Sequence, residues 1–159
     1  MSVRRPEQSD ASVIANWALS AEDTARWCSS DTAVPAERVI EWWSGSDVEP
    51  WLLVDALGEP IAYGELWVDV DEDEVELARL IVAPPLRSRG VGRRLVGELL
   101  GKAADTGLGA VFLRVRPGNE VAIRCYLGSG FVDVGPDRTA EFNAGQPVPY
   151  VWMEHIRAV

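Results

Sequence analysis

A short run of arginines and glycines carries the strongest chemical signal in this sequence: Arg87-Ser88-Arg89-Gly90-Val91-Gly92. It lies between an apolar run, Leu77 to Val82, and an amphipathic stretch, Val91 to Ala104. This order predicts a buried strand, a turn and a helix, so that unpaired backbone N–H groups and the positive end of the helix dipole converge on the turn. Such a turn binds phosphate groups.

The glycines and the nearby charges support an anion site at this turn. Side chains at positions 90 and 92 would keep a pyrophosphate away from the main chain, and glycine tolerates the backbone angles that such a turn requires. Positive charge surrounds the turn at Arg87, Arg89, Arg93 and Arg94. Taken alone, a glycine turn before a helix is also consistent with a plain helix start.

Two better-known phosphate loops do not fit the same residues. The loop of nucleoside triphosphatases requires Gly-x-x-x-x-Gly-Lys-[Ser/Thr], a string that the sequence lacks. A dinucleotide-binding turn requires a third glycine three residues after the second, where Leu95 stands. The turn is therefore not predicted to bind ATP or NAD.

A second segment places polar side chains after the next predicted strand. Pro117-Gly118 ends that strand, Asn119 can cap a short helix, and Gly128 follows the helix. Asn119 and Tyr126 are seven residues apart, about two helical turns, and so lie on nearly one face. Without the preceding loop, the default interpretation of these residues is an N-cap and a core tyrosine.

Together the two segments resemble the acyl-CoA site of the GNAT superfamily of N-acetyltransferases. The first is similar to the family's pyrophosphate loop, Arg/Gln-x-x-Gly-x-Gly/Ala, preceded here by the strand and lead-in from Glu76 to Pro84. The second is similar to Asn-x-x-Ala-x-x-x-Tyr-x-x-x-Gly-Phe, and every named spacing is kept from Asn119 to Phe131. The opening, Val3 to Ala11, is similar to the family's first strand and helix, although that pattern is common.

The resemblance implies where acetyl-CoA would bind. The main chain of Leu80, Ile81 and Val82 would pair with the pantetheine arm. The pyrophosphate would lie on the amides from Ser88 to Arg93, with Arg87 at the start of the loop, and Asn119 would hold the pantetheine. No metal is expected.

The resemblance also implies direct attack of a primary amine on the thioester. A free thiol has a pKa near 8.5, so the departing thiolate benefits from a proton donor, and Tyr126 is the phenol that matches the family's donor. For the general base the candidates are Glu76 and Glu65. Strand alternation puts Glu76 on the face of Ala78, Leu80 and Val82, and Glu65 on the face of Tyr63 and Trp67, so that either could line the acceptor cleft. For each of these two residues, a role as a solvated or salt-bridged surface carboxylate explains its presence about as well as a catalytic role does.

One departure bears on the acceptor. Members of the family that act on ribosomal-protein N-termini often have an acid in the strand before the second segment, where this chain has Arg114. Seven tryptophans, several of them in the first half of the chain, suggest either packing or an aromatic, partly acidic amine site.

Composition limits the classes of protein to which the chain can belong. A length of 159 residues predicts one domain, residues 1–159, and 47% hydrophobic with 25% charged residues is typical of a globular, water-soluble protein. No apolar run reaches the roughly 20 residues of a membrane span, and the N-terminus does not read as a signal peptide, so a cytoplasmic location is expected. Cys28 and Cys125 lack metal-like spacing, and His155 is interpreted as structural or solvent-facing.

The net charge of −10 argues against a nucleic-acid partner. By electrostatic steering it would favour a cationic acceptor, although an acidic surface is also explained by solubility. The expected partner is a small-molecule, peptide or protein amine; a homodimer is conceivable from the resemblance.

Periodicity predicts a mixed α/β (α+β) arrangement. Helical stripes occur at Val13 to Trp17 and Ala36 to Trp43, and three antiparallel strands precede the phosphate turn. The expected strands are Trp51 to Val54, Ile61 to Val68, Val75 to Val82, Ala110 to Val115, Phe131 to Val134 and Tyr150 to Ile156. The resemblance adds a mostly antiparallel sheet flanked by helices, with a splayed strand pair at the CoA site. The function expected is acetyl transfer from acetyl-CoA to an amine; the alternative is a catalytically inactive CoA-binding or regulatory module of the same fold.

Overall fold

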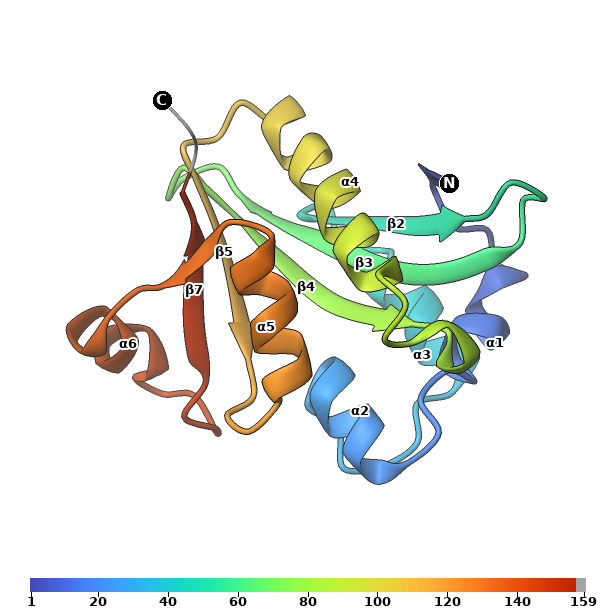
Figure 1. Ribbon diagram of the computed structural model, residues 1–159, viewed down its shortest axis with the longest axis horizontal. Helices are drawn as coiled ribbons and strands as arrows, with labels where there is room; N and C mark the ends of the chain where they lie inside the picture. The colour runs from blue at the N-terminus through green and yellow to red at the C-terminus, as the bar shows by residue number, and fades with distance from the viewer. Residues whose placement is uncertain (157–159) are drawn as a thin grey trace.

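The computed structural model describes residues 1–156, so the last three residues of the expected domain lie outside the described part. One seven-stranded sheet organises these residues in the order β1-β2-β3-β4-β5-β7-β6 (Figure 1). The strands are β1 (Ser2–Arg4), β2 (Val48–Val54), β3 (Pro60–Asp69), β4 (Glu74–Val82), β5 (Ala110–Val115), β6 (Phe131–Asp133) and β7 (Val151–His155). Only β4 and β5 pair in parallel, which confirms the expected mixed, mostly antiparallel sheet.

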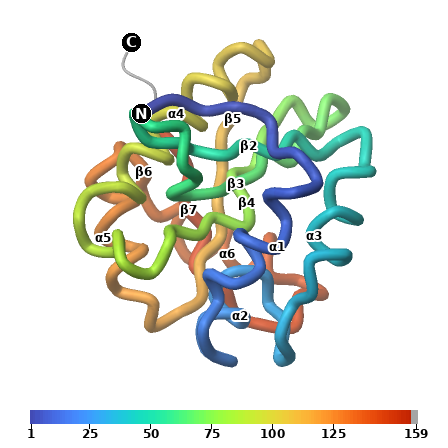
Figure 2. Tube along the Cα trace, turned by 90° about the vertical axis from the view of Figure 1, so that its right-hand side faces the viewer, coloured from blue at the N-terminus to red at the C-terminus, as the bar shows by residue number. Residues whose placement is uncertain are grey.

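Helices cover both faces of the sheet. They are α1 (Asp10–Ala15), α2 (Ala21–Cys28), α3 (Ala36–Trp42), α4 (Val91–Asp105), α5 (Glu120–Gly128) and α6 (Pro136–Asn143), with a 3-10 turn at Pro84–Leu86. Figure 2 shows α5 on one side of the central strands and α1 and α3 on the other. Accordingly there are two apolar clusters, one formed with α4 and α5 and one with α1, α2 and α3.

The long helix α4 forms because its apolar residues recur at helical spacing. Leu95, Val96 and Leu99 are fully buried against the sheet, while Arg93 and Arg94 are exposed. This amphipathic pattern drives the helix onto the sheet, and it confirms the stretch predicted after the glycine turn.

A β-bulge interrupts the pairing of β3 with β4. Glu65 lies opposite Ala78 and Tyr63 opposite Ile81, so Arg79 and Leu80 together face one residue of β3. Arg79 takes the left-handed conformation, with φ of +50°. The bulge therefore reverses the alternation of side chains along the second half of β4.

This reversal corrects one expectation. Leu80 and Val82 do not share a face with Glu76; they pack toward α4, whereas Ile81 belongs to the cluster with α1 to α3. Regular alternation could not predict the change, because a bulge adds one residue without leaving a clear sequence signal.

Beyond the bulge, β4 separates from β5. The parallel ladder joins Glu74–Leu77 to Ala110–Leu113, yet β4 continues to Val82 and β5 to Val115. The remaining peptide groups on these facing edges have no partner in the β4–β5 ladder. This is the splayed strand pair that was expected.

Two helices were not predicted. In α2 the Ser20 side chain accepts a hydrogen bond from the Asp23 amide, a capping pattern that is visible in the sequence. The helix was missed because it is short and mostly polar, and only Thr24 and Trp27 of its residues are buried. The other, α6, begins at Pro136 and buries none of its residues.

Within residues 1–156, none of the helices has the length and apolar character needed to cross a bilayer.

The close approach of α4 to the bulge predicts that Gly64→Ala destabilises the fold. A Cβ at this position would stand 2.8 Å from Leu99 Cδ1 and 3.3 Å from Leu80 Cγ, and Leu99 is fully buried in the core against the sheet, so it must shift within packed surroundings. We expect a loss of about 1–3 kcal/mol in the free energy of unfolding, measured by urea denaturation. The control is Gly101→Ala on the open side of α4, which should stabilise by about 0.5–1 kcal/mol. Equal stability of Gly64→Ala and wild type would contradict the packing described.

Candidate active site

A cavity of about 780 Å³ opens where β4 and β5 separate. Its wall is formed by α2, both splayed strands, the turn before α4, and α5. Ten of the residues expected to bind acetyl-CoA border it: Leu80, Ile81, Val82, Arg87, Ser88, Gly90, Gly92, Arg93, Asn119 and Tyr126. The side chains of Arg89 and Val91 do not border it; Arg89 is exposed, and Val91 packs beneath the turn with 6% exposure.

The turn before α4 presents a series of unpaired amides. Ser88 and Gly90 have φ of +60° and +83°, and only glycine adopts the second angle without strain. The first helical bond of α4 runs from the Arg94 amide to Gly90 O, and within residues 1–156 no backbone acceptor pairs with the amides from 88 to 93. These N–H groups and the helix dipole make the turn a cradle for an anion.

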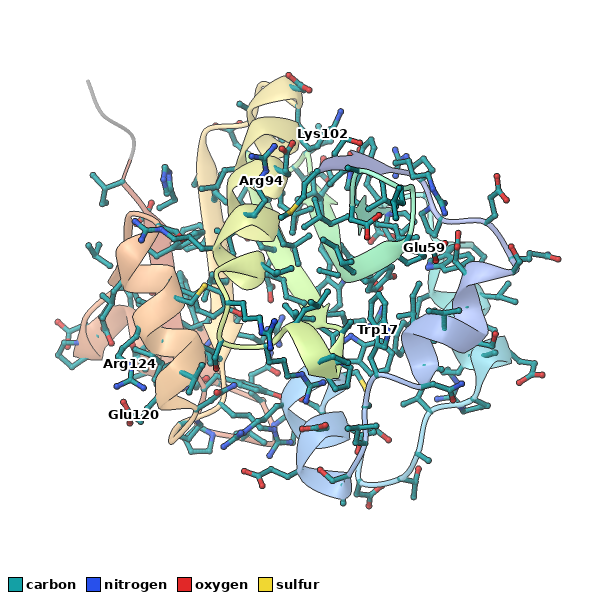
Figure 3. The ribbon with its side chains drawn as sticks, turned by 45° about the vertical axis from the view of Figure 1, so that its right-hand side comes forward. Trp17, Glu59, Arg94, Lys102, Glu120 and Arg124 are labelled. Carbon is teal, nitrogen blue, oxygen red and sulfur yellow. The ribbon has the colours of Figure 1, made fainter. Side chains whose placement is uncertain are left out.

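The arginines near this turn do not act together. Arg87 donates to Val82 O (3.0 Å), Trp17 O (2.7 Å) and Asp23 Oδ2 (3.1 Å), and so ties the turn to the segment from α1 to α2. Arg94 turns toward the N-terminus and donates to Met1 O (Figure 3). The four arginines are close in the sequence and were expected to surround one anion. Their hydrogen-bond acceptors instead direct Arg87 and Arg94 to different parts of the protein.

Asn119 and Tyr126 face the cavity from α5. Asn119 Oδ1 accepts from the Ala122 amide at 3.5 Å, so the side chain is an N-cap as well as part of the wall. Tyr126 packs edge-on against Phe131, and within the described chain its hydroxyl makes no hydrogen bond. Burial raises the pKa of Tyr126 above its ordinary value, so the phenol keeps its proton at neutral pH. The Tyr126 hydroxyl is therefore a proton donor that has no acceptor among the described residues.

Glu76 borders the cavity at the point where β4 and β5 separate. Arg114 donates two hydrogen bonds to the Glu76 carboxylate, from Nε to Oε2 at 2.7 Å and from Nη2 to Oε1 at 2.9 Å. Arg114 is itself held by Gln146 and by the ring of Trp152, 4.6 Å away. Each carboxylate oxygen of Glu76 retains a further lone pair toward the cavity.

Glu65 does not reach the cavity, contrary to the expectation that it could line the cleft. Its side chain is fully buried, and its oxygens accept from the Tyr63 hydroxyl, from Trp67 Nε1 (2.9 Å) and from Arg79 Nη1 (2.9 Å). Burial raises the pKa of the Glu65 carboxyl, although Arg79 and these donors oppose the shift. The sequence placed it on the correct face of β3, with Tyr63 and Trp67, but gave no measure of depth.

Arg79 joins this buried network to the bulge. Its guanidinium lies between the rings of Trp42 (4.1 Å) and Trp67 (5.0 Å), and its carbonyl accepts from Trp27 Nε1 at 2.9 Å. Both ends of the residue are therefore fixed. Several of the tryptophans in the first half of the chain serve to hold the bulge.

The charge of the cavity wall is mainly positive. Two carboxylates border it, those of Asp23 and Glu76. Against them stand seven arginines: Arg26, Arg79, Arg87, Arg93, Arg114, Arg116 and Arg124. Within residues 1–156 no group of three His, Cys, Asp or Glu side chains is arranged to hold a metal ion.

Comparison with known proteins identifies relatives of the part that carries these residues. A sequence model described as the acetyltransferase (GNAT) family matches residues 15–131. Over 62 residues the chain is 50% identical to an uncharacterised protein of Mycobacterium leprae and 42% identical to N-alpha-acetyltransferase RimI of Mycobacterium tuberculosis. Each match covers 39% of this chain but only 16% and 37%, respectively, of those relatives.

Solved structures share the fold along most of the chain. Spermidine N-acetyltransferase from Vibrio cholerae, in complex with CoA and spermine, superposes with a TM-score of 0.74 at 21% identity, over 84% of this chain and 82% of that one. The aminoglycoside acetyltransferase AAC(6')-Ib, in complex with paromomycin and acetyl-CoA, gives 0.77 at 21% identity, over 98% and 93%.

The buried state of Glu65 predicts a pH-dependent effect of Glu65→Gln on stability. Because the folded-state pKa is raised, the contribution of the carboxyl is fully present below its unfolded pKa, about 4.3, and is lost as pH rises through the folded value. From about pH 4 up to the folded-state pKa, wild type should therefore lose stability relative to Glu65→Gln as pH rises. Denaturation of both proteins across this range measures the difference, and Glu59→Gln on the exposed turn between β2 and β3 controls for the lost charge. If wild type instead gained stability relative to Glu65→Gln as pH rises, folding would lower the pKa of the carboxyl, which would contradict this prediction.

Proposed function

Because this chain belongs to the GNAT acetyltransferase family, we propose that it transfers an acetyl group from acetyl-CoA to a primary amine in one direct step. One observation carries the proposal. A single cavity is bordered by the anion cradle before α4, by the splayed part of β4, and by the open hydroxyl of Tyr126. These are the groups needed to hold a polyphosphate, an amide-containing arm and a departing sulfur.

The cavity wall suits acetyl-CoA along its length. The amides from 88 to 93 would hold the pyrophosphate, with Arg93 beside them. Peptide groups of Leu80 to Val82, which lie beyond the β4–β5 ladder, would pair with the amides of the pantetheine arm. The Asn119 amide nitrogen would add a donor, since its oxygen caps α5. Complexes of the structural neighbours with CoA or acetyl-CoA support this assignment.

Tyr126 would act as the general acid. When bound, acetyl-CoA supplies a thioester whose carbonyl carbon forms the new C–N bond while its C–S bond breaks. The Tyr126 hydroxyl would donate a hydrogen bond to the sulfur and pass its proton to it as the C–S bond breaks, which neutralises the charge of the departing thiolate; the proton that the amine loses would then restore the phenol. The raised pKa of Tyr126 keeps this proton in place until the sulfur acquires negative charge.

Glu76 would receive the proton that the amine loses, directly or through one water. It borders the cavity and keeps lone pairs free, whereas Glu65 is enclosed. Pairing with Arg114 would hold the Glu76 carboxylate in place at the opening between the strands. Glu65 would act as a positioning residue, since it holds Arg79 and thereby the bulge from which β4 turns away.

A catalytically inactive CoA-binding module is the competing proposal. Release of free thiol from acetyl-CoA, measured with a panel of amino acids, polyamines, aminoglycosides and peptides, separates the two. Turnover with any of these amines supports the enzyme. Tight binding of acetyl-CoA without turnover on the whole panel would support the module.

Tyr126→Phe tests the acid. The ring and its contact with Phe131 are kept, so the dissociation constant for acetyl-CoA should stay within about twofold of wild type, while kcat falls by about 10²–10⁴. Calorimetry gives the first quantity and thiol release the second. Unchanged turnover in a variant that still binds acetyl-CoA would remove Tyr126 from the mechanism.

Gly92→Ala tests the cradle. The added Cβ would meet Cys125 Sγ and Val82 Cγ2 at 3.7 Å, an ordinary contact distance, so the fold should accept it. The methyl group would nevertheless stand on the cavity wall, between the pyrophosphate and the main chain. We expect the dissociation constant for acetyl-CoA to rise by about tenfold or more, as for loss of a charge-assisted hydrogen bond. The matched control is Gly97→Ala in the same helix, where the methyl group meets nothing; equal binding by both variants would argue against the cradle.

A further inference from the structure

Three of the seven arginines that border this cavity are neutralised by carboxylates that the protein supplies itself. Three close pairs do this: Arg79 with Glu65 (2.9 Å), Arg87 with Asp23 (3.1 Å) and Arg114 with Glu76 (2.7 Å). In each pair the guanidinium is held in place by further contacts. None of these three arginines is free to bind a second anion as its main partner.

Arg116 is different. It borders the same cavity directly after β5, yet within the described residues neither a hydrogen bond nor an ion pair reaches its guanidinium. Its Nε is buried and has no acceptor. Buried donors without partners are rare in native proteins, and the other one among the described residues, Trp51 Nε1, lies away from the cavity. At Arg116, which borders the cavity, a ligand or a water molecule can supply the acceptor.

The direction of Arg116 separates it from the phosphate cradle. Val115 packs in the cluster that contains α4, and neighbouring residues of a strand point to opposite faces. Arg116 therefore leaves β5 on the side of Arg114, which faces away from α4. The phosphate cradle lies at the start of α4, so an anion bound by Arg116 is not one of the phosphates held there.

The spacing along β5 relates Arg116 to the base. Arg114, two residues earlier, holds Glu76, and two residues of a strand span about 7 Å. Arg116 directly follows the C-terminal end of β5 and borders the same cavity as Ser29 and Tyr150, whose hydroxyls are 2.6 Å apart. An acceptor with its amine at Glu76 thus has a guanidinium within reach of a second group on the same small molecule.

We propose that the acceptor is a small amine that also carries a carboxylate, as an amino acid does, and that Arg116 binds this carboxylate. The inference rests on the proposed N-acetyltransferase activity. It reverses the expectation from net charge, because the wall that meets the acceptor is richer in arginine than in acid. Arg116 is the specificity-determining residue in this arrangement, and Glu76 remains the group that faces the amine.

The test compares acceptors that differ only in this charge. An amino-acid panel is assayed by thiol release together with the corresponding amino-acid amides, and a diamine is included. Wild type should prefer the carboxylate member of a pair by at least about tenfold in kcat/KM, as expected for one charge-assisted contact. In Arg116→Gln the preference should fall to near one through a higher KM for the acceptor, with the KM for acetyl-CoA unchanged. Arg116→Lys, which keeps the charge, should restore part of it.

Arg38→Gln is the matched control, because Arg38 is exposed on α3 and pairs with Glu41 of the same helix. It should leave the preference intact. Turnover of the amides or the diamine as fast as of the amino acids would overturn the inference while upholding the acetyltransferase. A weaker affinity for acetyl-CoA in Arg116→Gln, with the acceptor preference kept, would also overturn it by assigning Arg116 to the other substrate. Absence of turnover with every acceptor, in a protein that binds acetyl-CoA, would refute the proposed activity itself.

Discussion

Burying the Glu65 carboxylate constrains the centre of this protein more than any other interaction. A carboxylate without contact to water requires a cation and several donors, and Arg79, Tyr63 and Trp67 supply them. Arg79 can reach Glu65 while its carbonyl bonds to Trp27 because the chain bulges at this residue. The bulge turns β4 away from the direction of β5, and the cavity occupies the space between them. Packing, charge and the opening of the site thus depend on one side chain that does not border the cavity.

The parts of the site that could be predicted from the sequence are those that depend on local geometry. A glycine turn before an amphipathic helix, and an asparagine seven residues before a tyrosine, determine the cradle and the wall of α5 through contacts within a few residues. The comparisons confirm the family that these two segments resembled. The catalytic and binding roles of the individual residues stay predictions.

What could not be predicted depends on distant contacts. Arg87 was grouped with its neighbours, but its partners Trp17 and Asp23 are more than sixty residues away in the chain. Glu76 and Arg114 were each identified, yet only the register of β4 with β5 makes them a pair. The depth of Glu65 is likewise a property of the assembled sheet and of α3, whose Trp42 covers Arg79. Side-chain type alone does not distinguish an arginine that holds the fold from one that meets a ligand.

The placement of arginines on the cavity wall has a consequence for how a negatively charged molecule arrives. The whole chain carries a net charge of −10, so at long range its field repels an anion of the size and charge of acetyl-CoA. Beyond the Debye length, about 8 Å at physiological ionic strength, that repulsion is screened, whereas the attraction of the arginines acts within the cavity itself. The net negative charge of the whole chain therefore opposes the approach of the anion, whereas the arginines favour its binding in the cavity. Dissolved salt weakens the long-range repulsion far more than the attraction within the cavity, so it favours the binding of the anion.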